Sequence, residues 1–256
     1  MRAVSPVLQK RCIPMSENIA AARADLAPSG TLQVGINFSN ILLTARDPAT
    51  RAPSGVALDL SHELGKRLGV PVKIVSYESA GELAESASSG AWQVGFLAIE
   101  PKRANEITFT AAYVEIDSTY LVPPGSPLKS IADVDRAGVR IAVTAKAAYD
   151  LYLTRTLQHA TLTRATGADA TFKLFVDEKM DALAGLKPQL EIDHDKLPGS
   201  RILEGRFTAV QQAVGTPKGH DIGAKFLREY VADIKASGLV AHTIEKNGIR
   251  GVSVAP

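Results

Sequence analysis

The sequence predicts a two-lobe α/β protein, with doubly wound sheets and a cleft between the lobes. Strand-like and helix-like segments alternate from residue 31 onward, the order that gives parallel sheets covered by helices. Residues 92–99 form a near-continuous apolar run, which is typical of a strand buried on both faces. A stiff turn at 123–127, with the sequence PPGSP, separates a first alternating series from a second. Ligands of such sheets bind at the carboxyl ends of the strands.

The first series begins with a short strand at 32–36. A helix is predicted over 56–68, because apolar residues recur every fourth position from Val56 to Leu68 and Gly69 follows. The remaining elements of this series are, in order, a strand at 72–75, a helix at 79–89 and the strand at 92–99.

The second series follows a short apolar segment at 120–122. Its predicted elements are, in order, a strand at 139–144, helices at 147–158 and 171–179, and strands at 180–186 and 201–203. We expect residues 207–214 to run back to the first lobe as a strand. Helices at 220–237 and 239–246 then end the chain, the last of them closed by Gly248.

Composition excludes several classes of protein. The 256 residues are 45% hydrophobic, enough for two modest cores. The formal charge of +2 is scattered and no basic block is interleaved with aromatic residues, which disfavours nucleic-acid binding. Cys12 is the only cysteine, so no internal disulfide forms; it is either a bystander in a loose tail or an intermolecular bridge. The sequence contains no run of ~18 apolar residues, so we expect no membrane insertion.

The sequence also lacks the common catalytic and metal-binding motifs. Its five histidines are isolated, and no nucleophile elbow or nucleotide-binding glycine motif is present. The segment 193–195 (DHD) is either a weak cation site or an acidic, solvated loop. We therefore expect no metal and no cofactor.

Several collinear stretches resemble the extracytoplasmic solute-binding proteins of family 3, the amino-acid-type substrate-binding proteins of ABC transporters that are related to the glutamine- and histidine-binding proteins. The resemblance runs from about residue 30 to about residue 250. Its clearest stretches are 54–60 (SGVALDL) with 66–70 (KRLGV), 99–104 (IEPKRA), 129–134 (KSIADV) and 180–183 (MDAL).

The resemblance implies the type II periplasmic-binding-protein fold, a monomeric receptor that closes on a ligand by bending at a hinge. It places an N-terminal tail at 1–29, lobe 1 at 30–115 plus 208–256, and lobe 2 at 116–207. Two hinge crossovers are expected near Tyr120 and near Gln211. The implied partners are a small-molecule ligand and an ABC permease.

Arg103 is the leading candidate for ligand binding. Members of the family use an arginine here as a clamp on the ligand carboxylate, and a planar guanidinium suits that geometry. The alternative is a surface arginine paired with Glu100 or Glu106.

Two departures from the family pattern in lobe 2 point to an anionic ligand. Leu186 stands where amino-acid binders place the acid that holds the ligand ammonium, and an ammonium buried without a counter-charge is costly. Lys146 and Ala147 stand near the start of the helix that follows the strand at 139–144, where the family offers hydroxyl groups. Lys146 either provides a second cation across the cleft from Arg103 or is a solvated residue.

The remaining candidates lie mostly at strand ends in lobe 1. Asn37 and Asn40 follow the first strand, where they either bind neutral polar groups of a ligand or serve the turn. Other candidate contacts are Ala98, Glu100, which could also replace the missing acid, Tyr77, which is otherwise a core residue, and Gln211, with Gln212 as the alternative on the same strand.

These features predict a non-enzymatic solute-binding protein for a small polar or anionic ligand, an organic acid or an atypical amino-acid derivative. One alternative is a dehydratase resembling the cyclohexadienyl dehydratases, in which Gln189 or Glu191 would lie nearest the catalytic acid; a glutamine cannot supply a titrating proton. The other is a cytoplasmic sensor or scavenger. Residues 1–30 lack the apolar segment of ~7–15 residues that export requires. The sequence as it stands is thus expected in the cytoplasm, and in the periplasm if a leader has been removed.

Overall fold

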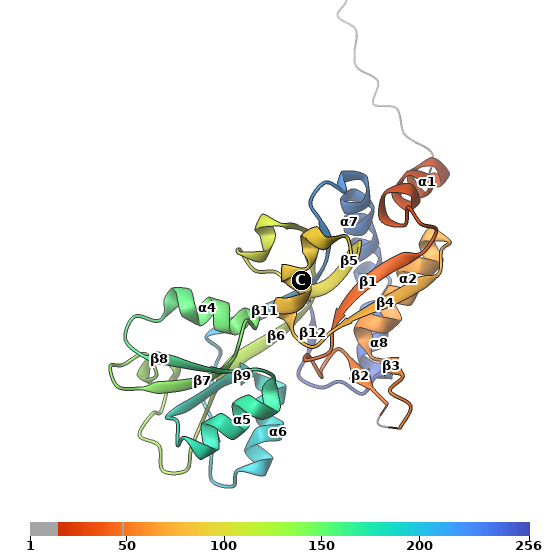
Figure 1. Ribbon diagram of the computed structural model, residues 1–256. Coiled ribbons are helices and arrows are strands. Elements are labelled where there is room, and N and C mark those ends of the chain that lie inside the picture. Colours follow the sequence, from red (N-terminus) through yellow and green to blue (C-terminus); the bar gives the residue numbers. More distant parts are fainter. Residues whose placement is uncertain (1–14, 48) are drawn as a thin grey trace, which may run out of the picture.

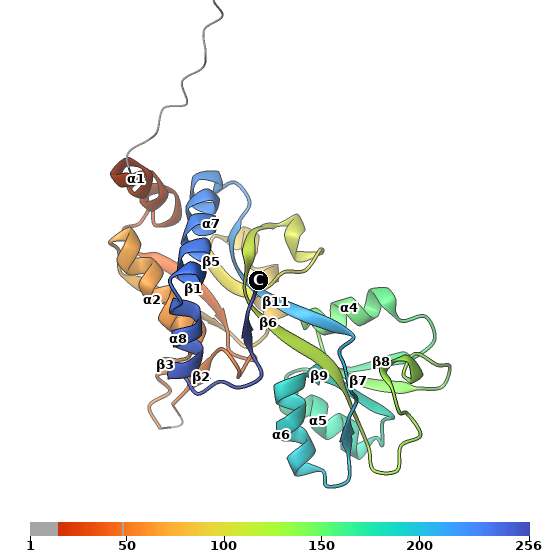
Figure 2. The same ribbon diagram turned by 180° about the vertical axis from the view of Figure 1, so that it is seen from behind.

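The computed structural model describes residues 15–47 and 49–256. Two groups of elements, the two lobes, are linked by two long strands, β6 (Ile107–Val122) and β11 (Thr208–Pro217), in both views of the molecule (Figures 1 and 2). The predicted lobe boundaries, near residues 115 and 208, fall on these two strands. Cys12 and the beginning of the predicted tail lie outside the described residues.

The lobes share one sheet with the strand order β4-β1-β5-β11-β6-β9-β7-β8. In lobe 1, β1 pairs in parallel with β4 and β5; in lobe 2, β7 pairs in parallel with β8 and β9. This arrangement confirms the predicted fold class. The bounds of the other strands on this path are β1 (Leu32–Asn37), β4 (Val72–Tyr77), β5 (Val94–Ala98), β7 (Arg140–Thr144), β8 (Thr161–Ala165) and β9 (Ala182–Leu186).

Four short strands complete the strand set of the described residues. β10 (Arg201–Ile202) and β12 (Ser253–Val254) both pair with β6, and β2 (Ala45–Arg46) pairs with β3 (Pro53–Ser54). The helices are α1 (Met15–Leu26), α2 (Val56–Leu68), α3 (Ala80–Glu85), α4 (Ala148–Thr156), α5 (Ala168–Asp177), α6 (Lys187–Lys196), α7 (Asp221–Ala236) and α8 (Leu239–Lys246). None of these described helices has the length and apolar character of a membrane span.

Each lobe has its own apolar core. In lobe 1, α2 buries Leu60, Leu64 and Leu68 completely, as the four-residue spacing predicts, and Gly69 ends the helix in a left-handed conformation. In lobe 2, side chains of β6, β7 and β9 pack around Tyr120, which contacts Phe207. Separate cores allow the lobes to move as two bodies about β6 and β11.

Helix α1 differs from the expectation of an N-terminal tail up to residue 29. It packs on α7 and buries Ala22 and Leu26 completely. Gly223 makes this approach possible, because a Cβ there would lie 2.4 Å from a methyl carbon of Leu26. The sequence pattern did not indicate α1, since most of its apolar residues are alanines.

Candidate ligand-binding site

A cleft lies where the carboxyl ends of strands from both lobes meet. Its empty space is about 630 Å³, including the part open to solvent. Lobe 1 contributes residues at or just after the ends of β1 and β5 and at the start of α3. Lobe 2 contributes residues at the ends of β7 and β9 and at the starts of α4 and α5, and β11 contributes Val210 and Gln212. The lining residues are Asn37, Ser39, Asn40, Ser79, Ala80, Leu97, Ala98, Arg103, Thr144, Ala145, Ala147, Ala148, Tyr149, Gly167, Ala168, Leu186, Val210 and Gln212.

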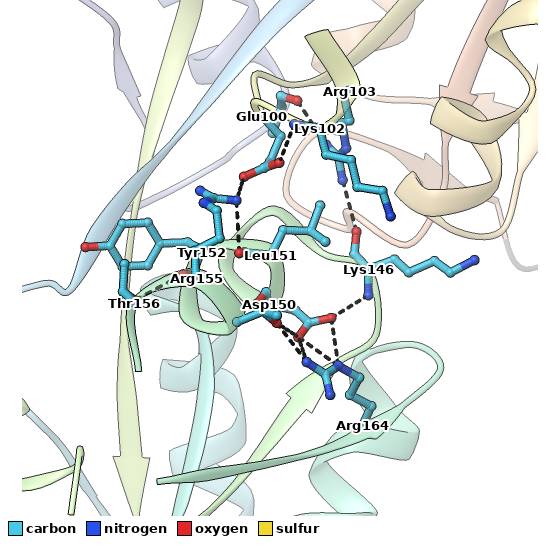
Figure 3. A network of polar contacts seen from close by, with 12 residues as sticks. Glu100, Lys102, Arg103, Lys146, Asp150, Leu151, Tyr152, Arg155, Thr156 and Arg164 are labelled. Atoms are coloured by element: carbon cyan, nitrogen blue, oxygen red, sulfur yellow. Dashed lines mark hydrogen bonds and ion pairs between the residues drawn. The ribbon is translucent and has the colours of Figure 1, made fainter. Parts of the chain in front are cut away.

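Arg103 is the one charged residue in this lining, and it is 5% exposed. Its Nη1 donates to the carbonyl of Ala98, 2.9 Å away in the same lobe. Its Nη2 donates to the carbonyl of Lys146, 3.0 Å away in the other lobe (Figure 3). Burial lowers the pKa of Arg103 to about 10, a shift that nearby Glu100 opposes. At neutral pH the cleft therefore presents a buried cation, and no carboxylate group lines it.

Lys146 contributes its backbone to this site, whereas its ammonium points away from the cleft. The Nζ atom donates to Glu85 at 2.6 Å, so the expected second cation facing Arg103 is absent from the described lining. Lys146 has a φ of 59°, a left-handed conformation that is unusual for a lysine. Its N–H donates to Asp150 at 2.8 Å, and Arg164 donates to the same carboxylate from Nε at 3.0 Å (Figure 3).

Two helix N-termini of lobe 2 open into the cleft. The N-cap of α4 is Ala147 and that of α5 is Gly167, and neither has a side-chain cap. The first-turn N–H groups of both helices thus lack capping side chains and carry the positive end of the helix dipole. Ala147 occupies its predicted place at the edge of the cleft.

Asn37 and Asn40 line the lobe 1 side, and both also serve the turn. The Asn37 Oδ1 accepts from the Ser39 N–H at 3.0 Å, and the Asn40 Oδ1 accepts from the Leu42 N–H at 3.3 Å. Ala98 and Leu186 also line the cleft at the ends of β5 and β9.

Gln212, rather than Gln211, faces the cleft from β11. Gln212 is 8% exposed, while Gln211 lies on the opposite side of the strand and donates to Glu115 at 2.8 Å. Successive side chains of a strand point to opposite faces, so only one of the two glutamines can reach the cleft. The assignment of Gln211 is corrected accordingly.

Glu100 and Tyr77 differ from expectation, because neither lines the cleft. Glu100 is 2% exposed and forms an ion pair with Arg155 of α4, a second link between the lobes (Figure 3). The Tyr77 hydroxyl accepts a hydrogen bond from Ser86 at 2.8 Å, and its ring packs with Leu83 and Trp92 in a small core. Glu100 thus belongs to the lobe contact and Tyr77 to the core.

Several lining residues were not predicted from the sequence, among them Ser79, Tyr149, Gly167 and Val210. Tyr149 could have been suspected from its place in the first turn of the predicted helix after β7. Ser79 and Gly167 directly precede α3 and α5, positions that the fold brings to the cleft.

The residues considered for dehydratase chemistry lie elsewhere. Gln189 on α6 donates to Asp193 at 3.2 Å, and Glu191 is exposed on the same helix. Neither residue lines the cleft. No cluster of three or more potential metal ligands occurs within residues 15–47 and 49–256.

The model of the bacterial extracellular solute-binding proteins, family 3, matches residues 32–248 of the sequence. The chain belongs to this family. The match covers both lobes and both linking strands of this solute-binding protein. No curated protein sequence matches it.

Solved structures of similar fold include several amino-acid receptors. An L-cysteine receptor of Neisseria gonorrhoeae is 20% identical, with a TM-score of 0.75 over 90% of this chain and 95% of that one. An amino acid ABC transporter substrate-binding protein from Streptococcus pneumoniae, bound to L-arginine, is 18% identical, with a TM-score of 0.73 over 92% and 99%. An ancestral amino acid-binding protein described as a precursor of cyclohexadienyl dehydratase is 22% identical, with a TM-score of 0.73 over 87% and 97%. At these identities the likeness establishes the fold.

Proposed function

We propose that this solute-binding protein serves an ABC-type uptake system and closes on a small organic anion that lacks a free amine. The observation that carries the proposal is the buried charge of Arg103 in a lining without a carboxylate. Glu100 lies near the Arg103 guanidinium, but it is paired with Arg155 and lies outside the lining, so the cleft side of this buried cation faces no carboxylate. A ligand carboxylate would supply the counter-charge on that side.

The helix N-termini of lobe 2 support the same class of ligand. Uncapped N–H groups and the dipoles of α4 and α5 favour an anion at the cleft. A carboxylate near Arg103 would then be held from both lobes, which is how a ligand favours the closed form.

The absence of an acid from the lining argues against a free amino acid as the ligand. Receptors of similar fold are described with L-cysteine and L-arginine, so an amino acid is the main alternative. Its ammonium would enter this cleft among N–H donors and beside Leu186, without a counter-charge.

We propose binding without chemical change to the ligand. The lining has no carboxylate and no histidine to act as a general acid, and Gln189 and Glu191 lie outside it. The resemblance to a precursor of a dehydratase makes turnover of prephenate and arogenate the specific reaction to test. By family, we place the protein outside the cytoplasmic membrane, where it would deliver its ligand to a permease.

The test is a thermal-shift screen of carboxylates without an amine (propanoate, butanoate, pyruvate, lactate, succinate) against the common amino acids. A ligand that binds only the folded state stabilises it by about 2.7 kcal/mol at a hundred times Kd. Stabilisation by the amine-free carboxylates is the expected result. Stabilisation by amino acids alone would overturn the proposed ligand class.

A further inference from the structure

The amide groups of Asn37 and Asn40 have a fixed orientation in the cleft. The Asn37 Oδ1 accepts from both the N–H and the Oγ of Ser39, at 3.0 and 2.8 Å, and the Asn40 Oδ1 accepts from the N–H of Leu42. A backbone N–H can only donate, so it identifies the amide atom facing it as oxygen. The amide oxygen of each side chain therefore faces its own turn.

The two amide nitrogens are what remains for a ligand. Neither Nδ2 group donates to any acceptor in the described part of the chain, and both residues line the cleft. They also line a small adjoining hollow with Gln212, so the three amide side chains lie together. On this side of the cleft the two asparagines therefore offer N–H donors to a ligand.

Two further groups of the lining can only donate, whereas the hydroxyl side chains and Gln212 can both donate and accept. Arg103 has no acceptor atom, and the N-termini of α4 and α5 present N–H groups. An amine placed against Asn37 and Asn40 would meet other donors and lose hydrogen bonds that it makes in water. An oxygen with free lone pairs would accept from both amides.

We propose that Asn37 and Asn40 select for a second acceptor group on the ligand, a carboxylate or a carbonyl, and against an amine. This inference rests on the proposed function, in which a first carboxylate binds near Arg103. The ligand class is thus the short dicarboxylates and oxo acids, which share an acceptor oxygen at the second position.

The test compares ligands that differ in one group. The two series are propanoate, alanine and pyruvate, and butanoate, 4-aminobutanoate and succinate, each titrated by isothermal calorimetry. In every series that binds, we expect the acceptor-bearing member to bind at least ~10-fold tighter than the amine-bearing one. Pyruvate and succinate separate the carbonyl from the second carboxylate. An amine-bearing member that binds as tightly as its acceptor counterpart would overturn the inference.

Two isosteric variants, Asn37→Asp and Asn40→Asp, keep the oxygen that the turn uses and replace the free NH₂ by a second oxygen. Each should weaken binding of pyruvate and succinate at least ~10-fold and improve binding of the matching amine. Asn105→Asp, at an exposed residue outside the lining, controls for added charge.

The outcomes separate the two proposals. Carboxylates that bind through Arg103 but ignore the Asn37 and Asn40 variants would leave the proposed function standing and overturn the inference. Failure of every carboxylate in both series would overturn both.

Discussion

The guanidinium of Arg103, in lobe 1, donates to the main-chain carbonyl of Lys146, in lobe 2, with 3.0 Å between Nη2 and the oxygen. The same guanidinium lines the cleft. Arg103 thus takes part both in the contact between the lobes and in the candidate site for the ligand charge. A ligand that binds beside Arg103 in the closed form would gain a preorganised partner, because the two carbonyls already fix the guanidinium.

Arg103→Ala should weaken binding of the best carboxylate from the screen by at least about 2 kcal/mol, because it removes the charge that faces the anion. Calorimetric titration measures the change. Arg206→Ala is the matched control, since Arg206 is an exposed arginine of lobe 2 that pairs with Asp117 outside the cleft. An unchanged Kd for Arg103→Ala would remove this residue from the site.

Leu186→Asp should abolish or weaken binding of the same carboxylate. Leu186 lines the cleft at the end of β9, and an aspartate there would add a negative charge beside a ligand of the same sign. Leu186→Asn changes size and polarity without charge and should have the smaller effect. Tighter binding by Leu186→Asp would contradict an anionic ligand.

Asp150→Asn should loosen the contact between the lobes. Asp150 is 2% exposed and accepts from the Lys146 N–H, so it stabilises the left-handed backbone that turns the Lys146 carbonyl toward Arg103. An asparagine cannot pair with Arg164, and we expect a loss of about 1–3 kcal/mol in the free energy of unfolding. The distance between the lobes should also become longer or more widely distributed.

Pulsed electron resonance between spin labels at Lys73 and Lys129, in a Cys12→Ser background, measures that distance. Asp135→Asn is the control, because Asp135 accepts backbone N–H groups of residues 158–160 in the same lobe, with no link to Lys146. It should lower stability without changing the distance. If both variants made the distance between the lobes longer or more widely distributed, Asp150 would have no special part in closure.

Binding should be nearly independent of pH from about pH 6 to about pH 9 and should weaken as the pH rises through about 10. Burial lowers the pKa of Arg103 to about 10, so the folded protein holds this proton less tightly than the unfolded chain. On this account the free energy of unfolding without ligand rises with pH above about 10. An anion bound beside Arg103 raises the pKa of Arg103 again. The affinity for the anion therefore falls as the pH rises through about 10, whereas the free energy of unfolding without ligand rises. Calorimetry in buffers of different ionisation enthalpy would detect the proton taken up on binding.

Much of the fold was predictable because its elements carry strong local patterns. Helix α8 has the predicted bounds, and α2 buries the leucines that define its apolar face. Helix α6 was missed because its ten residues are mostly polar and charged, and only its tertiary position buries Leu190 and Asp193. Strand β8 was missed for a similar reason, since none of its residues is fully buried.

The candidate site was predictable where a residue's place follows from a strand end. Asn37, Ala98 and Leu186 are the last residues of β1, β5 and β9, and the fold brings these ends together. Lys146 has an unusual left-handed backbone conformation, and its ammonium binds Glu85, while the choice between Gln211 and Gln212 depends on strand register. Neither the conformation nor the register can be read from residue type alone.

The pairing of β6 with β11 shifts register between Gln212 and Ala213 and again before Gly215. Such irregularities bend a strand pair and increase its twist. Since both strands pass between the lobes, any rotation of one lobe against the other must be taken up as torsion in this ladder or in the segments that flank it. Gln212, which faces the cleft, lies at the first shift. A ligand that contacts Gln212 would therefore act on the linking strands at the position where their register shifts, and its release would remove that constraint on their twist.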